Sequence, residues 1–230
     1  MKIDLPFHQS WIGEEEHLEV ADTLNSGWLT TGPKTKRFEE AFSDYIGCKH
    51  AIALNSCTAG LNLALEMQGF PEGDEVITTP MTFPATANVI LLQKMKPVLV
   101  DIEPGTLLID PTKIEDKITS RTKAIMPVHL FGLSVDMDPL LQIAKKYNLF
   151  VIEDAACGFG SKYKGRHVGT LGDTGCFSFH PRKAIATGEG GMITTNDDAL
   201  AEKMRSMRDH GAAMSDFQRH HGAKPYLLAE

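Results

Sequence analysis

The stretch that decides the fold is GDTGCFSFHPRKAIATGEGGMITT, which runs from Gly172 to Thr195. Two short apolar runs, Gly175–Phe179 and Met192–Thr195, predict strands at its two ends. The loop between them holds a single lysine, Lys183, and three glycines that permit close approach of another group. Such a lysine is most often a solvated side chain. The alternative is an amine that loses its proton and attacks a carbonyl.

Composition and charge indicate a globular protein. The length of 230 residues suffices for one large domain or two small ones, and the 42% hydrophobic content can fill a sizeable core. The net charge is −7 and there is no basic stripe, so we expect no nucleic-acid partner. The first residues, Met1–Pro6, lack the apolar core of a signal peptide, and no apolar run is long enough to cross a membrane. The sequence predicts a soluble cytoplasmic protein.

The cysteines are predicted to be free thiols of a reducing compartment. They form no CxxC pair and no Cys/His cluster with metal-ligand spacing, so we expect no metal site. The four positions are Cys48, Cys57, Cys157 and Cys176.

Strand and helix patterns alternate from Gly47 onward. The predicted strands are His50–Leu54, Glu75–Thr78, Pro97–Asp101, Lys123–Val128 and Leu149–Glu153, followed by the two that flank Lys183. The predicted helices are Thr58–Gln68, Pro84–Met95, Asp136–Tyr147 and Asp198–His210, with a weak helix at Ile114–Ile118. Strands rich in Val and Ile without polar alternation are buried on both faces. The pattern therefore predicts an α/β fold, with a mostly parallel seven-stranded sheet and helices on both faces.

The N-terminal part precedes this alternation. Residues 1–13 show no regular pattern, whereas Glu14–Ser26 and Lys34–Ile46 have helical spacing. We expect an irregular segment over residues 1–13 and one large domain over residues 14–230.

Ligands of such sheets bind at the carboxyl ends of the strands. The first strand is followed by Cys57, Thr58 and Ala59, which begin a helix; this is either an ordinary N-cap or a phosphate site built from backbone N–H groups. Phe83 follows the second strand, and it is either a core aromatic or a ring that stacks on a flat ligand.

Two further strand ends carry polar residues. Asp154 follows the apolar run of the fifth strand, where it is either a cap or turn residue or the partner of a cationic ring nitrogen. Ser178 and His180 follow the next strand, and a histidine here is more often packed than catalytic. A phosphate cradle, a stacking aromatic, an acid and an amine are together the parts of a pyridoxal phosphate site.

With these residues in view, the chain resembles the DegT/DnrJ/EryC1/StrS family of sugar aminotransferases, within the fold-type I pyridoxal phosphate enzymes. The matching segments are Trp28–Pro33, Asn55–Ala59, Thr82–Phe83, Glu153–Ala156 and, above all, Gly172–His180, Lys183 and Thr187–Met192. The resemblance covers essentially the whole chain, and the segment around Lys183 is its most specific part.

The resemblance implies pyridoxal 5′-phosphate as cofactor, and transfer of an amino group, usually from glutamate, to a keto carbon of a nucleotide-linked sugar. Lys183 is the implied catalytic residue, which holds the cofactor as a Schiff base and shuttles a proton. Asp154 would pair with the ring nitrogen and Phe83 would stack on the ring. The residues expected to bind the cofactor are Cys57, Thr58, Ala59, Phe83, Asp154, Cys157, Ser178, His180 and Lys183.

Cys157 departs from the family pattern, because relatives commonly carry His or Gln there. Some relatives replace the lysine by histidine and are dehydratases of the same sugars, so Lys183 favours aminotransfer over that alternative. A non-catalytic regulator that binds pyridoxal phosphate would lack the lysine or carry a DNA-binding module. A dinucleotide site at Gly158–Gly160 is disfavoured because Tyr163 stands where the third glycine belongs.

The resemblance also has implications for the length of this chain and for the oligomeric state of the protein. We expect this chain to span the large domain alone, because its last residues, Lys224–Glu230, show no helix-ending pattern. In relatives, the segment after a motif like Arg208–Gly211 reaches the site of a neighbouring subunit. We therefore expect a homodimer with shared active sites, and a 230-residue piece that binds cofactor weakly, aggregates or turns over poorly.

Overall fold

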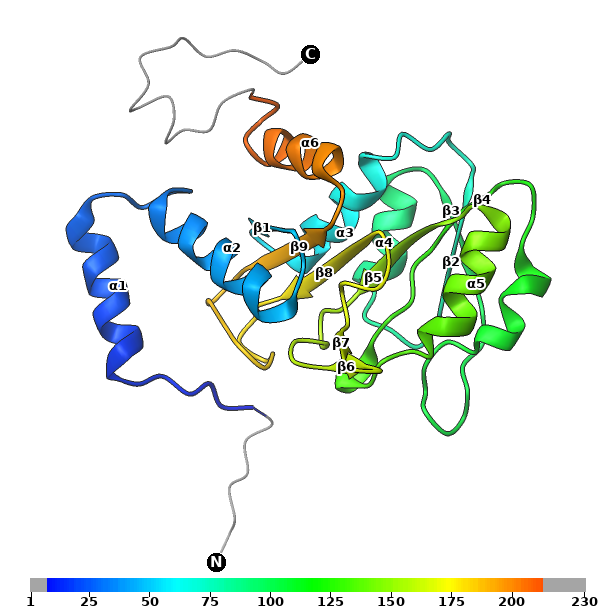
Figure 1. Ribbon diagram of the computed structural model, residues 1–230, viewed down its shortest axis with the longest axis horizontal. Coiled ribbons are helices and arrows are strands. Elements are labelled where there is room, and N and C mark those ends of the chain that lie inside the picture. Colours follow the sequence, from blue (N-terminus) through cyan, green and yellow to red (C-terminus); the bar gives the residue numbers. More distant parts are fainter. Residues whose placement is uncertain (1–7, 213–230) are drawn as a thin grey trace, which may run out of the picture.

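The computed structural model describes residues 8–212, and the expectations for Met1–Pro6 and Lys224–Glu230 fall outside them. Its main feature is a seven-stranded sheet with the order β1-β9-β8-β5-β4-β2-β3, shown in Figure 1. The strands are β1 (His50–Leu54), β2 (Glu75–Thr78), β3 (Lys96–Leu99), β4 (Thr122–Ile125), β5 (Phe150–Asp154), β8 (Thr174–Ser178) and β9 (Gly191–Thr195). All neighbouring pairs from β8 to β3 are parallel, and only β9 runs antiparallel to its two neighbours. This confirms the predicted mostly parallel sheet.

Helices cover both faces of the sheet, as predicted. The helices on the sheet are α2 (Pro33–Ile46), α3 (Cys57–Glu66), α4 (Ala85–Leu92), α5 (Met137–Tyr147) and α6 (Asp198–Arg208), and α1 (Glu14–Ser26) lies apart from it in Figure 1. Because successive side chains of a strand point to opposite faces, Ile152 of β5 packs with α3, α4 and α6, whereas its neighbour Val151 packs with α5. On the face of Val151, Phe177 of β8 packs against Phe42 and Ile46 of α2.

Two parts of the chain differ from the predictions. The weak helix expected at Ile114–Ile118 is a pair of 3-10 turns, η1 (Pro111–Lys113) and η2 (Glu115–Lys117). Sequence patterns also gave no sign of the hairpin of β6 (Lys162–Tyr163) and β7 (Arg166–His167). Strands of two residues are too short to show a period, so such a hairpin leaves no pattern to read.

The first helix has the predicted bounds but buries none of its side chains. Its apolar residues Leu18, Val20 and Leu24 are all exposed. It is linked to α2 by charge, since Lys34 and Arg37 both bind the carboxylate of Glu19. Exposed ion pairs of this kind contribute little to stability. Within residues 8–212, therefore, few contacts hold the helix in place.

Candidate functional site

The sheet register brings the predicted strand ends together. β8 pairs with β5 so that Cys176 lies opposite Asp154. β9 lies between β1 and β8, and its first residue, Gly191, pairs with Leu54 on one side and with Ser178 on the other. The carboxyl ends of β1, β5 and β8 therefore meet at one edge of the sheet, beside the loop that carries Lys183.

Asp154 is a buried carboxylate at this edge. Its Oδ2 accepts a hydrogen bond from the hydroxyl of Thr86 at 2.7 Å, and its Oδ1 accepts one from the backbone N–H of Ala156 at 3.1 Å. Burial raises the pKa of Asp154, and the hydrogen bond from Thr86 acts against that rise. Within residues 8–212 it forms no ion pair with a cationic side chain. The residue thus makes a local turn contact and is also suited to pair with a cationic group of a ligand.

The N-terminus of α3 lies next to Gly191. A Cβ at Gly191 would stand 2.3 Å from the carbonyl carbon of Ser56, so glycine is what permits this close approach. Ser56 is the N-cap, and its Oγ accepts from the N–H of Ala59 at 3.1 Å. No acceptor among the described residues takes the N–H groups of Cys57 or Thr58. An ordinary N-cap and two available N–H groups therefore coexist here.

Lys183 reaches the turn that follows β5. Its Nζ lies 3.2 Å from Sγ of Cys157, and its backbone N–H donates to the carbonyl of His180 at 2.8 Å. Lys183 as a whole residue is half-buried. The lysine and the cysteine that departs from the family pattern are therefore neighbours, 26 residues apart in the chain.

Ser178 and His180 shape the beginning of this loop. The N–H of His180 donates weakly to Oγ of Ser178 at 3.4 Å, and Nδ1 of His180 accepts from the N–H of Arg182 at 3.2 Å. Since Nδ1 accepts from a backbone N–H, any proton of the neutral ring is on Nε2. His180 thus has a structural role in the turn, whether or not it contacts a ligand.

Phe83 lies in the loop before α4 and is 70% exposed. It is therefore not the core aromatic that was the alternative interpretation. Thr82, the residue directly before it, is linked to the site, because its hydroxyl lies 2.7 Å from that of Thr86 and Thr86 donates to Asp154.

Sequence reasoning missed Thr86 and the buried pair of His129 and Glu153. Both side chains of the pair are fully buried, and His129 Nε2 lies 2.9 Å from Oε2 of Glu153. Nδ1 of His129 accepts from the N–H of Val135, so Nε2 carries the proton and donates to the carboxylate. The one available signal was Glu153 itself, an acid that directly follows Val151 and Ile152 in a predicted buried strand.

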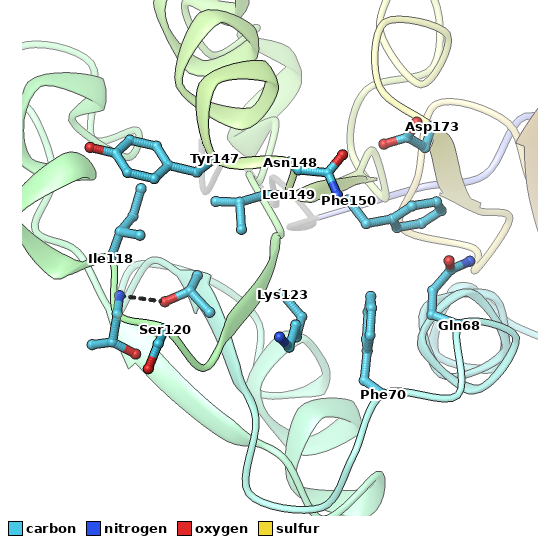
Figure 2. A pocket seen from close by; sticks show the side chains of 12 residues that line it. Gln68, Phe70, Ile118, Ser120, Lys123, Tyr147, Asn148, Leu149, Phe150 and Asp173 are labelled. Atoms are coloured by element: carbon cyan, nitrogen blue, oxygen red, sulfur yellow. Dashed lines mark hydrogen bonds between the residues drawn. The ribbon is translucent and has the colours of Figure 1, made fainter.

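An open hollow of about 580 Å³ lies elsewhere, around the first residues of β4 and β5. Figure 2 shows it with Lys123, Phe150, Phe70 and Asp173 around it. These are the amino ends of the strands, so the hollow shares no residue with the edge that carries Asp154 and Lys183. Over residues 8–212, no group of three or more His, Cys, Asp or Glu side chains is placed to bind a metal ion. No helix in the same range is long and apolar enough to cross a membrane.

A fold of this kind with a lysine in the β8–β9 loop defines an aminotransferase-like domain, and comparison with known proteins gives the family. Residues 10–226 match the model of the DegT/DnrJ/EryC1/StrS aminotransferase family, to which the chain therefore belongs. The chain is 50% identical over 216 residues to the spore coat polysaccharide biosynthesis protein SpsC of Bacillus subtilis, covering 94% of this chain and 56% of SpsC.

Solved structures agree with this assignment. Helicobacter pylori PseC, an aminotransferase involved in the biosynthesis of pseudoaminic acid, matches with a TM-score of 0.90 at 36% identity, over 98% of this chain and 59% of PseC. DesI, solved in the presence of its TDP-sugar product, matches with a TM-score of 0.82 at 35% identity, over 90% of this chain and 52% of DesI. The chain thus spans little more than half the length of these relatives.

The residues at the sheet edge fit a pyridoxal phosphate group. Asp154 is a buried acid that forms no ion pair with any residue from 8 to 212, which suits a protonated ring nitrogen, and the available N–H groups of Cys57 and Thr58 suit a phosphate. The glycine at position 191 leaves the N-terminus of α3 close to the lysine loop. The two N–H donors, the carboxylate of Asp154 and the amine of Lys183 are therefore chemically consistent with this cofactor.

Proposed function

We propose that this protein is a pyridoxal 5′-phosphate-dependent aminotransferase that moves an amino group from glutamate to a keto carbon of a nucleotide-linked sugar. The observation that carries the proposal is the meeting of buried Asp154 and the Lys183 amine at one edge of the sheet. Family membership supports the reaction class, and the chemistry of the edge supports the cofactor.

Each residue has a task that follows from its position. When bound, the cofactor supplies a ring that withdraws electrons from the carbon undergoing reaction. Asp154 keeps the ring nitrogen protonated by charge pairing. Lys183 holds the cofactor covalently and moves a proton to and from the α-carbon of the donor. The N–H groups of Cys57 and Thr58 and the hydroxyl of Ser178 bind the phosphate.

Four further residues complete the proposed site. Phe83, which is exposed, offers its face to the cofactor ring. Cys157 contacts the amine of Lys183 from the turn after β5. Ala59 and His180 support the site from the backbone of the helix N-terminus and of the lysine loop. The thiol of Cys157 is a weaker donor than the His or Gln of relatives, so we expect its contact to the ring to contribute less.

The substrate class is supported by the relatives. SpsC is named for spore coat polysaccharide biosynthesis, PseC for pseudoaminic acid biosynthesis, and DesI was solved with a TDP-sugar product. We propose a substrate of the same class, a keto sugar carried on a nucleotide. We also propose that the complete protein works as a homodimer, which is consistent with the exposed apolar side chains of α1.

The test is a panel of keto sugars linked to uridine, thymidine, guanosine and cytidine nucleotides, each incubated with the protein, pyridoxal 5′-phosphate and glutamate. We expect 2-oxoglutarate, and one sugar nucleotide whose mass shows an amine in place of the carbonyl oxygen. A product that has lost water without gaining nitrogen would support a dehydratase instead. Cofactor binding without reaction on any sugar or with glutamate would support a non-catalytic protein and contradict the proposal.

Asp154→Asn is expected to lower turnover by roughly 10²–10³-fold while leaving the fold intact. The amide oxygen can still accept from the N–H of Ala156, and the amide NH₂ can donate to the hydroxyl of Thr86, which then donates to Thr82. The variant also lacks the buried charge that burial disfavours. The half-reaction with glutamate measures turnover, and circular dichroism on heating measures the fold. Normal turnover would leave Asp154 as a turn residue only.

A further inference from the structure

Thr86 holds the carboxylate of Asp154 from an element that carries none of the predicted site residues. It lies in α4, is fully buried, and donates to Oδ2 of Asp154 at 2.7 Å across a separation of 68 residues. The second hydrogen bond to this carboxylate is local, from the N–H of Ala156. Among the described residues, Thr86 is therefore the side chain that fixes the carboxylate by a hydrogen bond.

The direction of these hydrogen bonds follows from the number of protons that each group can donate. An ionised carboxylate only accepts, so the single hydroxyl proton of Thr86 is used on Asp154. The hydroxyl of Thr82 lies 2.7 Å from that of Thr86 and must therefore donate to it. The result is a chain of hydrogen bonds from the hydroxyl of Thr82 through that of Thr86 to the carboxylate of Asp154. Each hydrogen bond in this chain polarises the next. The chain begins at the residue before Phe83.

This contact acts against the effect of burial on Asp154. Burial raises the pKa of the carboxylate, and the hydrogen bond from Thr86 is the largest of the influences that lower it. The other titratable groups that act on it from neighbouring elements are His129, Lys183, Cys57 and Cys176. Burial raises the pKa of both thiols well above their usual range, so they stay uncharged between pH 5 and 8.

We propose that Thr86, with Thr82 behind it, is a positioning residue that keeps the carboxylate of Asp154 ionised and oriented for pairing with a cationic ring nitrogen. The inference rests on the proposed function, because that function supplies the ring. It adds a residue on α4 that acts on the chemistry through Asp154 without contacting the reacting atoms.

The test uses three single variants, and the first of them is also made in the Asp154→Asn background. Thr86→Val removes the hydroxyl and keeps the shape, whereas Thr86→Ser keeps the hydroxyl. The matched control is Thr78→Val, because Thr78 is equally buried but donates its hydroxyl to the neutral carbonyl of Met126 at 2.8 Å. Both valine variants lose a buried hydrogen bond, but only in Thr86→Val is the acceptor that loses it a carboxylate.

The first readout is the stability of the protein without cofactor at pH 5 and pH 8. Because the pKa of Asp154 is raised in the folded state, its contribution to stability falls as the pH rises above the ordinary value of 3.8 toward the folded value. Thr86→Val raises the folded pKa further, so it should be more destabilising at pH 8 than at pH 5. This pH dependence should vanish in the Asp154→Asn background. Thr78→Val should destabilise equally at both pH values, and Thr86→Ser should behave like the wild type.

The second readout is the affinity for pyridoxal 5′-phosphate, measured by titration of the protein. Thr86→Val should weaken binding roughly tenfold, with Thr86→Ser and Thr78→Val close to the wild type. A wild type that binds no pyridoxal 5′-phosphate would overturn the proposed function, and with it the cofactor half of this inference. A wild type that binds, with a Thr86→Val variant equal to it in affinity and in pH profile, would overturn the positioning role alone.

Discussion

Lys183→Ala is expected to abolish covalent attachment of the cofactor and to lower the half-reaction with glutamate by at least about 10⁴-fold. The amine of Lys183 is the one that the β8–β9 loop presents to the sheet edge, where it contacts Sγ of Cys157 at 3.2 Å. Alanine removes both the nucleophile and the group that moves the proton.

The measurement is borohydride reduction in the presence of pyridoxal 5′-phosphate, followed by peptide mass spectrometry. We expect the reduced label on Lys183 in the wild type and no label in the variant. The control is Lys203→Ala, because Lys203 is exposed on α6, away from this edge. A variant that keeps its label and its activity would show that another lysine carries the cofactor.

Glu153→Gln is expected to lower the free energy of unfolding by about 3–5 kcal/mol. The carboxylate is fully buried, and each of its oxygens accepts two hydrogen bonds. Oε1 accepts from the N–H groups of Leu171 and Gly172, both at 2.7 Å. Oε2 accepts from Nε2 of His129 at 2.9 Å and from the N–H of Gly169 at 2.8 Å. In glutamine, one of these two oxygens is replaced by an NH₂ group. Whichever way the amide is turned, this NH₂ group would face two N–H donors, and those two buried donors would lose their acceptor.

This loss would be a large part of the total stability of a domain, which is commonly 5–15 kcal/mol. Chemical denaturation followed by circular dichroism measures it. The control is the adjacent variant Asp154→Asn, whose hydroxyl chain can reverse direction and so accommodate an amide. We expect one of these two neighbouring carboxylates to be needed for the fold and the other for the chemistry. A Glu153→Gln protein within about 1 kcal/mol of the wild type would contradict this division.

The sheet was predictable because its strands are short apolar runs between recognisable turns. The bounds of Glu14–Ser26, His50–Leu54 and Glu75–Thr78 are those expected from the sequence. The strand at Lys123–Val128 is shorter in the structure, where β4 ends at Ile125. Backbone hydrogen bonds to β2 and β5 continue past that point at Met126 and Pro127, and assigned strand ends commonly differ by one or two residues.

The interpretation of single residues was harder, because each had an ordinary alternative. In two cases the structure is compatible with both interpretations of a segment. Ser56 caps α3 while its neighbours keep two available N–H groups. Asp154 makes a turn contact with Ala156 while it remains a buried acid. A pattern in the sequence cannot separate two roles that one residue performs at once. The assignment of the cofactor-binding residues therefore stays a prediction that the variants above test.

The sequence by itself determined the alternation of strands and helices, the placement of Lys183 between two strands, and the family, because these are encoded in local patterns and motifs. Only the tertiary structure decided that Thr86 binds Asp154, that Glu153 accepts four hydrogen bonds, and that Gly191 lies against Ser56. These contacts join residues far apart in the chain. They depend on strand order and register, which the period of a single strand does not specify.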